Sequence, residues 1–179
     1  REGQIIPVHV YTSGTEAELF VNGKSYGRKA KEEGKDFRLV WDSVVYQPGN
    51  VKVIAYKDGK EWAKDEIQTT GEAQKIQLSV DHASIIGSED ELAFVTATIV
   101  DASGRKVPTA CLPLKVEVTG CGELVATDNG DPTSFTPFQS AERESFNGLA
   151  LAIVRGKKGT TGKIQVQVSG AGLESDSIE

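Results

Sequence analysis

Methionine and long hydrophobic runs are both missing from this sequence. None of its 179 residues is Met, so we expect it to be a segment of a longer polypeptide. No apolar run approaches the roughly 20 residues that cross a bilayer. The first residues, REGQIIPVHV, lack the charged and apolar regions of a signal peptide. The sequence therefore predicts no membrane partner and no export signal of its own.

Concentrated positive charge is lacking as well. The chain has 20 Lys and Arg residues against 26 Asp and Glu residues, which gives a net charge of −6. The basic residues are interspersed with acids, so no basic stripe is available to neutralise a phosphate backbone. We therefore expect no nucleic-acid partner.

Cysteine and histidine are too scarce to build a metal centre. Cys111 and Cys121 enclose LPLKVEVTG, and ten residues of extended chain span roughly 33 Å, far more than a disulfide bridges. Free thiols are therefore predicted unless this segment folds back on itself. His9 and His82 are distant in sequence and have no nucleophile motif beside them. A zinc site needs more ligands than these, so we expect no metal and no cofactor.

Helical periodicity is absent, and alternation with a period of two takes its place. Apolar residues recur at every second position in six segments: AELFVNG, FRLVWD, VKVIAY, LAFVTATIV, PLKVEVTG and KIQVQVSG. This pattern is typical of half-buried antiparallel strands. The turn pairs Asn22-Gly23, Asp58-Gly59 and Ser103-Gly104 supply positive φ between strands. The sequence therefore predicts an all-β fold.

A polar, Gly-containing stretch, TTGEAQ at residues 69–74, separates two sets of strands. Strands at this spacing favour immunoglobulin-like packing over any α/β design. We predict two consecutive immunoglobulin-like antiparallel β-sandwich domains, at residues 1–71 and 72–179. In the second domain LALAIV is apolar on both faces, which is typical of a central strand.

The stretch from Thr127 to Gly148, TDNGDPTSFTPFQSAERESFNG, concentrates four acids, two Asn-Gly pairs and two prolines. Glu142 and Glu144 come nearest to the carboxyl pair of a glycosidase. The two carboxyl groups of such a pair face each other across the sugar and usually belong to different structural elements. Residues two apart in an extended segment share one face. Arg143 between them indicates a solvated polar segment, and no catalytic residue is predicted.

The letters DNGD, from Asp128 to Asp131, allow two interpretations. Clustered oxygens on a glycine turn suit calcium, but the acidic spacing of an EF-hand is absent and Gln139 stands at its last position. A turn whose Asn and Asp side chains bond their own backbone explains the same letters. We favour the turn, while an ion at Asp128 and Asp131 stays an open alternative.

The segment GKKGTTGK at residues 156–163 has the composition of a phosphate-binding loop without its pattern. The spacing of a P-loop is missing, and no helix is predicted after it. The glycines, lysines and threonines instead predict a hairpin loop.

The two tryptophans fall in different patterns. In FRLVWD the alternation puts Phe37, Leu39 and Trp41 on one side, which predicts that Trp41 is core. Trp62 shares its parity with polar residues such as Lys64 and is expected to be at least partly exposed. An exposed Trp suits domain docking or a carbohydrate platform, and docking is favoured because one aromatic makes a poor platform.

The sequences of both halves resemble those of one protein family. The strings VHVYTSGTEAELFVNGKSYGRK, RLVWDSVVYQPGNVKVIAYKDGK and TTGEAQKIQL resemble the post-barrel domain of bacterial glycoside hydrolase family 2 enzymes, chiefly β-galactosidases. The later strings SEDELAFVTATIVDASGRKVPTA and VTGCGELVATDNGDPTSFTPFQSAERESFNGLALAIVR resemble their C-terminal immunoglobulin-like, or invasin-like, domain. The resemblance covers nearly the whole chain.

The resemblance implies an inert fragment of an enzyme. The family's catalytic glutamates lie on a (β/α)₈ barrel that would precede Arg1, and no pattern for such a barrel exists here. Residues 128–148 would be a long ordered connection, with Phe135, Phe138 and Phe146 as buried anchors. The implied role is structural, as domain packing against the upstream barrel and as a contributor to the edge of the substrate cleft.

Other expectations follow from the same resemblance. The parent would be a β-galactosidase-like enzyme of the bacterial periplasm or cell surface, and a homo-oligomer is a candidate assembly. A competing hypothesis is a carbohydrate-binding module that holds a glycan at Trp62, Tyr26 or the polar loop of Asn129, Asp131 and Arg143. A third hypothesis, an adhesin-like spacer, follows from the fold alone.

Overall fold

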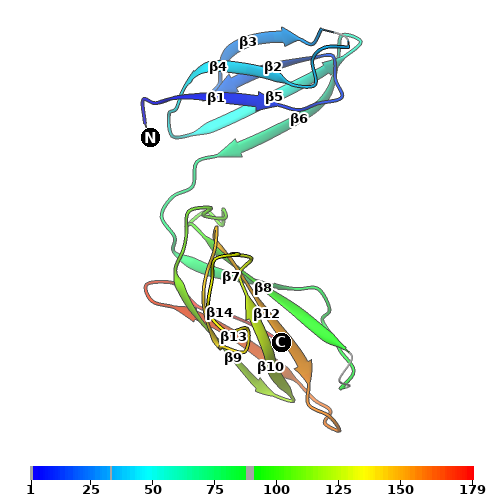
Figure 1. The fold of residues 1–179 in the computed structure, drawn as a ribbon, viewed down its shortest axis with the longest axis vertical. Coiled ribbons are helices and arrows are strands. Elements are labelled where there is room, and N and C mark those ends of the chain that lie inside the picture. Colours follow the sequence, from blue (N-terminus) through cyan, green and yellow to red (C-terminus); the bar gives the residue numbers. More distant parts are fainter. Residues whose placement is uncertain (1, 33, 88–90) are drawn as a thin grey trace. The chain divides into compact units, whose positions relative to one another are not determined.

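The computed structural model describes residues 2–32, 34–87 and 91–179, and every regular element among them is a β-strand. No helix able to cross a bilayer is found in these three ranges. The chain divides into two compact units, Arg1–Thr69 and Thr70–Glu179, and each consists of two antiparallel sheets (Figure 1). The predicted all-β fold of consecutive sandwiches is confirmed.

The first unit packs a two-stranded sheet on a four-stranded sheet. Its strands are β1 (Ile5–Val10), β2 (Glu16–Val21), β3 (Lys24–Ala30), β4 (Leu39–Val45), β5 (Asn50–Lys57) and β6 (Lys60–Gln68). The small sheet has the order β1-β4, and the large sheet has the order β3-β2-β5-β6.

Local sequence explains the hairpins of the first unit. Asn22 and Gly23 join β2 to β3, and Asp58 and Gly59 join β5 to β6, each pair with positive φ at both residues. Such φ values match a two-residue turn to the twist of the flanking strands. The two predicted turns are therefore confirmed.

The core of the first unit forms from alternate strand residues. Its buried side chains are Ala17, Leu19, Val21, Leu39, Trp41, Val44 and Ala55. Trp41 is 3% exposed and donates its Nε1 hydrogen to the Tyr26 carbonyl at 3.2 Å, so its predicted place in the core is confirmed. Phe37 does not join it and is 86% exposed. The expectation for Phe37 was wrong because β4 begins only at Leu39.

The second unit packs two four-stranded sheets. Its strands are β7 (Lys75–Val80), β8 (Leu92–Val100), β9 (Pro113–Gly120), β10 (Gly122–Asp128), β11 (Glu142–Glu144), β12 (Leu149–Gly156), β13 (Ile164–Gly170) and β14 (Asp176–Ile178). One sheet has the order β10-β12-β8-β7, and the other has the order β11-β9-β13-β14.

Sheet order tests two further predictions. LALAIV lies in β12, between β10 and β8, so its predicted central position is confirmed. The hairpin predicted at residues 156–163 is wrong, because β12 and β13 belong to different sheets. Glycine-rich composition marks a change of direction, but it does not tell a hairpin from a crossing between sheets.

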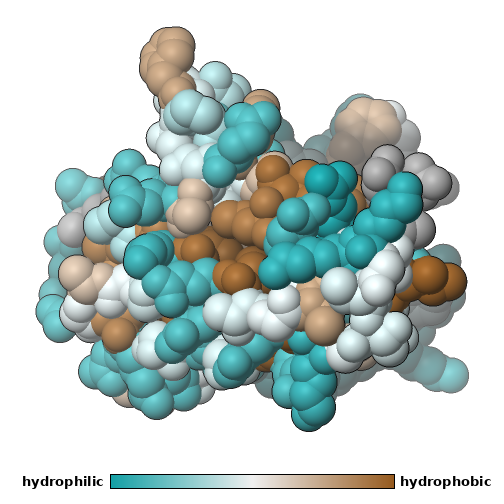
Figure 2. All heavy atoms as spheres, turned by 90° about the horizontal axis from the view of Figure 1, so that it is seen from below, coloured by the Kyte–Doolittle hydropathy of each residue, from teal (hydrophilic) through white to brown (hydrophobic). Residues whose placement is uncertain are grey.

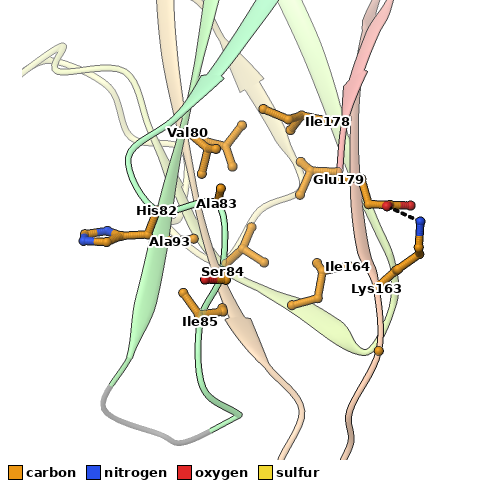
Figure 3. A pocket seen from close by; sticks show the side chains of 14 residues that line it. Val80, His82, Ala83, Ser84, Ile85, Ala93, Lys163, Ile164, Ile178 and Glu179 are labelled. Atoms are coloured by element: carbon orange, nitrogen blue, oxygen red, sulfur yellow. Dashed lines mark hydrogen bonds and ion pairs between the residues drawn. The ribbon is translucent and has the colours of Figure 1, made fainter.

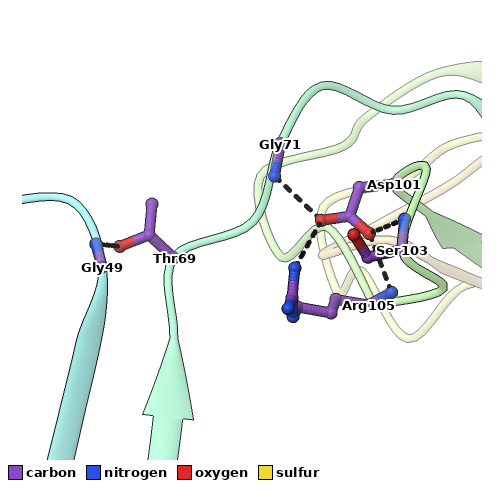
Figure 4. A network of polar contacts seen from close by, with 6 residues as sticks. All are labelled: Gly49, Thr69, Gly71, Asp101, Ser103 and Arg105. Atoms are coloured by element: carbon purple, nitrogen blue, oxygen red, sulfur yellow. Dashed lines mark hydrogen bonds and ion pairs between the residues drawn. The ribbon is translucent and has the colours of Figure 1, made fainter.

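Asp101 fixes the start of the second unit (Figure 4). Its carboxylate accepts the backbone N–H groups of Gly71 at 2.9 Å, Ser103 at 2.8 Å and Arg105 at 3.0 Å. The N–H of Gly71, followed by that of Arg105, holds the pKa of Asp101 below its usual range. In the first unit the backbone N–H of Gly49 donates a hydrogen bond to Thr69 Oγ1 at 3.1 Å.

The two cores share no residue, so each should respond to its own cavity mutation. Leu19→Ala removes a fully buried side chain and should destabilise the first unit by about 3 kcal/mol. Ile99→Ala should act by a similar amount on the second unit. Calorimetry should show a separate transition lowered by each variant. A common shift of one transition by both variants would contradict this expectation.

Stability of the second unit should fall in acid because of Asp101. A carboxyl group whose folded pKa is lowered stabilises the fold above its ordinary pKa of 3.8 and loses this effect as pH falls further. The thermal midpoint should therefore drop below about pH 4. Asp101→Asn should lower the midpoint at neutral pH by a few degrees and flatten the acid limb. An unchanged acid limb in this variant would count against the role of Asp101.

Candidate functional site

The connection between β10 and β12 carries three of the four candidate site residues. Asn129, Asp131 and Arg143 belong to it, whereas Trp62 lies on β6 of the other unit. This connection, residues 129–148, includes the short strand β11, which pairs with β9. It runs from one sheet to the other and back, as the expected ordered connection between two core strands.

The DNGD letters form a turn that is held by its own side chains. Asp128 Oδ1 accepts the backbone N–H of Asn129 at 2.7 Å, and Asn129 Oδ1 accepts that of Asp131 at 2.9 Å. The N–H and the hydroxyl of Thr133 both donate to Asp131 Oδ1 and hold the pKa of Asp131 below its usual range. The favoured interpretation as an Asx-type turn is confirmed.

Arg143 makes more side-chain hydrogen bonds to this connection and to the adjoining end of β10 than the other candidate residues do. Its side chain is buried, with 3% of the residue exposed. Nε donates to Thr127 Oγ1 at 3.1 Å, and Nη2 donates to the carbonyls of Thr127 and Pro137, each at 2.8 Å. Nη1 donates to the Thr136 carbonyl at 3.1 Å and to Ser134 Oγ at 3.4 Å. All five N–H donors of the guanidinium are therefore used, two by Thr127 of β10 and three by residues of the loop.

The expectation that Arg143 lies in a solvated segment was wrong. Glu142 and Glu144 do share the exposed face of β11, and strict alternation turns the residue between them inward. The acceptors that receive Arg143 come from a loop whose path the sequence does not reveal. The burial is tolerated because every donor has a partner, since an unsatisfied buried charge would be far more costly.

The exposed pair Glu142 and Glu144 does not have the geometry of a glycosidase pair. Both side chains leave the same strand on the same side, roughly 6.7 Å apart along it. Hydrolysis of a glycosidic bond needs carboxyl groups that oppose each other across the sugar. Among the described residues, no group of three His, Cys, Asp or Glu side chains is placed to hold a metal ion.

Two of the three phenylalanines expected as buried anchors are exposed. Phe135 is 100% exposed and Phe138 is 59% exposed, whereas Phe146 is half-buried. Phe135 lies between Ser134 and Thr136, two of the groups that Arg143 binds. The Arg143 bonds take up the inner side of the loop, so the phenyl ring of Phe135 points to solvent. The loop is thus held firmly while it presents an apolar side chain.

Trp62 is half-exposed, as predicted, with 54% of its surface accessible. It lies where the register of β5 and β6 shifts between Ala55 and Tyr56. Its Nε1 hydrogen is donated to Ser13 Oγ at 3.0 Å, and Lys57 Nζ lies 4.8 Å from the ring centroid. The indole N–H of Trp62 therefore already has a hydrogen-bond partner within the chain.

The remaining single residues have structural surroundings. Cys111 and Cys121 are both free, as predicted, because the straight strand β9 lies between them. His82 pairs through Nδ1 with Asp81 at 3.0 Å at the surface. Tyr26, the alternative sugar contact, packs against the core of the first unit.

Sequence analysis missed the buried partners of this connection. Thr127 is 0% exposed and Ser145 is 1% exposed. Ser145 Oγ accepts the Leu112 N–H at 2.9 Å and donates to the Ala110 carbonyl at 3.2 Å. Parity in β11 was an available signal for the buried Arg143, but parity in β10 gave none for Thr127, because the register of β10 shifts between Leu124 and Ala126.

Replacing Arg143 should remove the hydrogen bonds that hold the loop in place. Arg143→Leu leaves the Thr127, Thr136 and Pro137 acceptors without donors and should destabilise the second unit by about 3 kcal/mol. Arg143→Lys keeps the charge but cannot reproduce the planar fork, so only part of the stability should return. Urea unfolding and amide exchange at residues 133–138 measure both effects. Equal stability of Arg143→Leu and the unmodified chain would contradict this account of the loop.

Two family models match the chain. The model described as glycoside hydrolase family 2 C-terminal domain 5 matches residues 76–179. Residues 3–63 match a domain of unknown function, DUF4982. The first match alone covers more than half of the chain.

Similar proteins carry this region as a small part of a longer chain. A beta-galactosidase of Bacteroides ovatus, BoGH2A, is 36% identical over 163 residues, which is 91% of this chain and 19% of that protein. The crystal structure of a glycosyl hydrolase family 2 member from Bacteroides cellulosilyticus matches 99% of the chain with a TM-score of 0.94 and 30% identity, and 24% of that structure is covered.

A beta-glycosidase structure from Bacteroides vulgatus gives a TM-score of 0.88 at 30% identity, over 99% of this chain and 22% of that one. The chain thus spans about a fifth of the length of the curated relative described above. Its described residues offer a braced loop and two sandwich cores, and Glu142 and Glu144 do not oppose each other as a glycosidase pair does. The chain belongs to the glycoside hydrolase family 2 C-terminal domain 5 family, as a non-catalytic accessory region of such enzymes.

Proposed function

We propose that this region packs, through the braced loop of its second unit, against the catalytic part of a longer β-galactosidase-like enzyme. That part is an upstream (β/α)₈ barrel which carries the acid/base and nucleophile glutamates. The support is the family match of the second unit and the small share of its relatives that it spans. The region itself hydrolyses nothing in this proposal.

Phe135 is the observation that carries the proposal. A fully exposed phenyl ring has no stabilising contact within the chain. The loop beneath it is nevertheless fixed by Arg143, through Ser134, Thr136 and Pro137. A pre-ordered apolar side chain loses little conformational entropy on docking, and aromatic anchors of this kind dominate protein interfaces.

The charges around the loop indicate the chemistry of the docking partner. Asp128, Asp131, Glu142 and Glu144 all belong to it or flank it, while the Arg143 charge is enclosed. An apolar socket edged with basic side chains would complement such a surface. This is the surface that we expect on the barrel.

A glycan-binding role has weaker support. Sugar platforms present an aromatic face and hydrogen-bonding groups together, but the Trp62 indole donates to Ser13 and is overlaid by Lys57. Asn129 is also occupied, since its Nδ2 donates to the Glu144 carbonyl at 2.8 Å. Location in the bacterial periplasm or at the cell surface, and a homo-oligomeric parent, complete the proposal on the ground of the family resemblance.

The effect of one substitution in two settings tests the docking role. Phe135→Ala should leave the thermal midpoint of the isolated chain unchanged, because the ring touches nothing there. In the full-length polypeptide it should lower the temperature of thermal inactivation by several degrees, because an interface anchor is lost. The isolated chain should not hydrolyse p-nitrophenyl β-galactoside. The full-length polypeptide that carries Phe135→Ala should hydrolyse it with an unchanged kcat/KM.

Phe37→Ala is the matched control, since it also removes an exposed phenyl ring, one that is 86% accessible. It should be neutral in both settings. If Phe135→Ala raises KM and spares stability, the loop borders the substrate cleft and packing is not its role. Saturable quenching of Trp fluorescence by lactose, abolished in Trp62→Ala, would favour the glycan-binding alternative.

A further inference from the structure

Hydrophobic residues are not spread evenly over the surface. In the face shown in Figure 2 they gather near the middle, among hydrophilic side chains. The second unit also contains an open cleft of about 270 Å³ between its two sheets (Figure 3). Its lining combines the apolar Val80 and Ile164 with the polar Ser84. Lys163 and Glu179, which form an ion pair, line it as well. This mixed lining does not select one class of ligand, whereas a free strand edge of the first unit has a regular pattern of charge.

This free edge is the strand β6, which is the last strand of the four-stranded sheet. β5 pairs with it on one side, and the sheet order places no other described strand on its far side. All nine residues of β6 are exposed. Its far side is therefore a row of backbone donors and acceptors that can accept another strand.

Two other edges of the first unit are protected by their backbones. The register of β3 against β2 shifts around Gly27, which has a φ of 91°, and such a bulge bends an edge away from a flat neighbour. β1 carries Pro7 at its own register shift, and proline cannot donate to a ladder. β6 contains no proline and keeps a regular register from Ala63 to Gln68. It lacks both of these protections.

The register of β5 and β6 shows which backbone groups face the free edge. The N–H of Thr69 donates to the Gly49 carbonyl at 2.8 Å, so these two residues form a hydrogen-bonded pair. Hydrogen-bonded and non-hydrogen-bonded pairs alternate along an antiparallel ladder. Lys64, Glu66 and Gln68 therefore belong to non-hydrogen-bonded pairs with β5. Their N–H and C=O groups point outward, to the free edge.

The side chains of β6 complement those of a second β6 in one register. When two copies of the strand lie antiparallel about a twofold axis at Asp65, Lys64 of each copy comes opposite Glu66 of the other. Ala63 and Ile67 come opposite each other in the same way. Opposite charges and apolar pairs across strands are stabilising, and the symmetry forms each pair twice. An axis at Lys64 or at Glu66 would instead place that residue opposite its own charge.

Asp65 opposes this pairing in two ways. On the axis it faces Asp65 of the second copy in a non-hydrogen-bonded pair, whose Cα atoms lie only about 4.5 Å apart. Like charges directly opposite each other are destabilising. Asp65 Oδ1 also accepts the backbone N–H of Glu66 at 2.9 Å, which is an edge donor that a second strand needs. An inward charge of this kind, opposite Val53 of the core side, is a known protection of edge strands.

We propose that β6 is an interaction edge that fits a second copy of this chain, and that Asp65 keeps this edge unpaired. Without the Asp65 carboxylate, two β6 strands pair about the axis described above and join two four-stranded sheets. A second copy suits the edge better than an unrelated strand, because the charge order of β6 matches itself. The proposal concerns the first unit and does not depend on the docking role of Phe135.

Asp65→Thr tests the role of the carboxylate. It removes the charge and the acceptor of the Glu66 N–H, while threonine is a good strand former. In sedimentation the unmodified chain should be a monomer and the variant a dimer, with a dimer dissociation constant lowered at least about tenfold. Amide exchange at Lys64 and Glu66 should slow in the dimer. Asp42→Thr, which removes an exposed carboxylate from β4, is the matched control and should stay monomeric. A monomeric Asp65→Thr variant would overturn the proposal.

Charge reversal tests the register and the choice of occupant. On the Asp65→Thr background, Lys64→Glu makes both paired positions acidic, and Glu66→Lys makes both basic. Each of these chains should be a monomer alone, and an equal mixture should form a heterodimer, because every acidic position then meets a basic one. If each chain associates alone as readily as Asp65→Thr does, the edge accepts strands without selection. That outcome would overturn the assignment of the edge to a second copy.

Discussion

The second unit depends on one buried cation. Arg143 uses five N–H donors to bind Thr127 in β10 and the loop residues that follow it. The 20 residues between β10 and β12 are also held by the pairing of β11 with β9 and by the bonds of Ser145, but Arg143 ties down the stretch from Ser134 to Pro137, and long loops are stable only when side chains tie them down. The guanidinium suits this place because its planar fork matches several carbonyl acceptors at once. The hydrogen bonds of the buried Arg143 guanidinium thus keep the loop ordered.

Loop order in turn explains the exposed aromatic residue. Phe135 follows directly after Ser134, which Arg143 binds, so the backbone on the inner side is occupied and the ring faces solvent. A surface phenyl ring on a mobile loop would lose its freedom on contact with a partner. On a braced loop this loss is small, which makes the ring a suitable anchor. A rigid contact element agrees with an accessory role within a hydrolase family, which the family match and the small covered share of the relative support.

Sequence reasoning succeeded where the signal was local. The Asx turn at Asp128 and Asn129, the turns at Asn22 and Asp58, and the core position of Trp41 all follow from residues within a few positions of each other. It failed where distant segments decide. Phe135 and Phe138 are apolar, and apolarity alone predicts burial, but the Arg143 bonds hold this loop with both rings outside. Residues 156–163 have the composition of a hairpin, yet the sheets place their flanking strands apart.

The sequence by itself determined the strands and most of their turns, because alternation and positive φ are properties of neighbouring residues. It also carried the family resemblance that the C-terminal domain match bears out. Only the tertiary structure decided which sheet each strand joins, that Arg143 is buried and that Phe135 is exposed. These features depend on contacts between residues far apart in the chain, and no local pattern encodes such contacts.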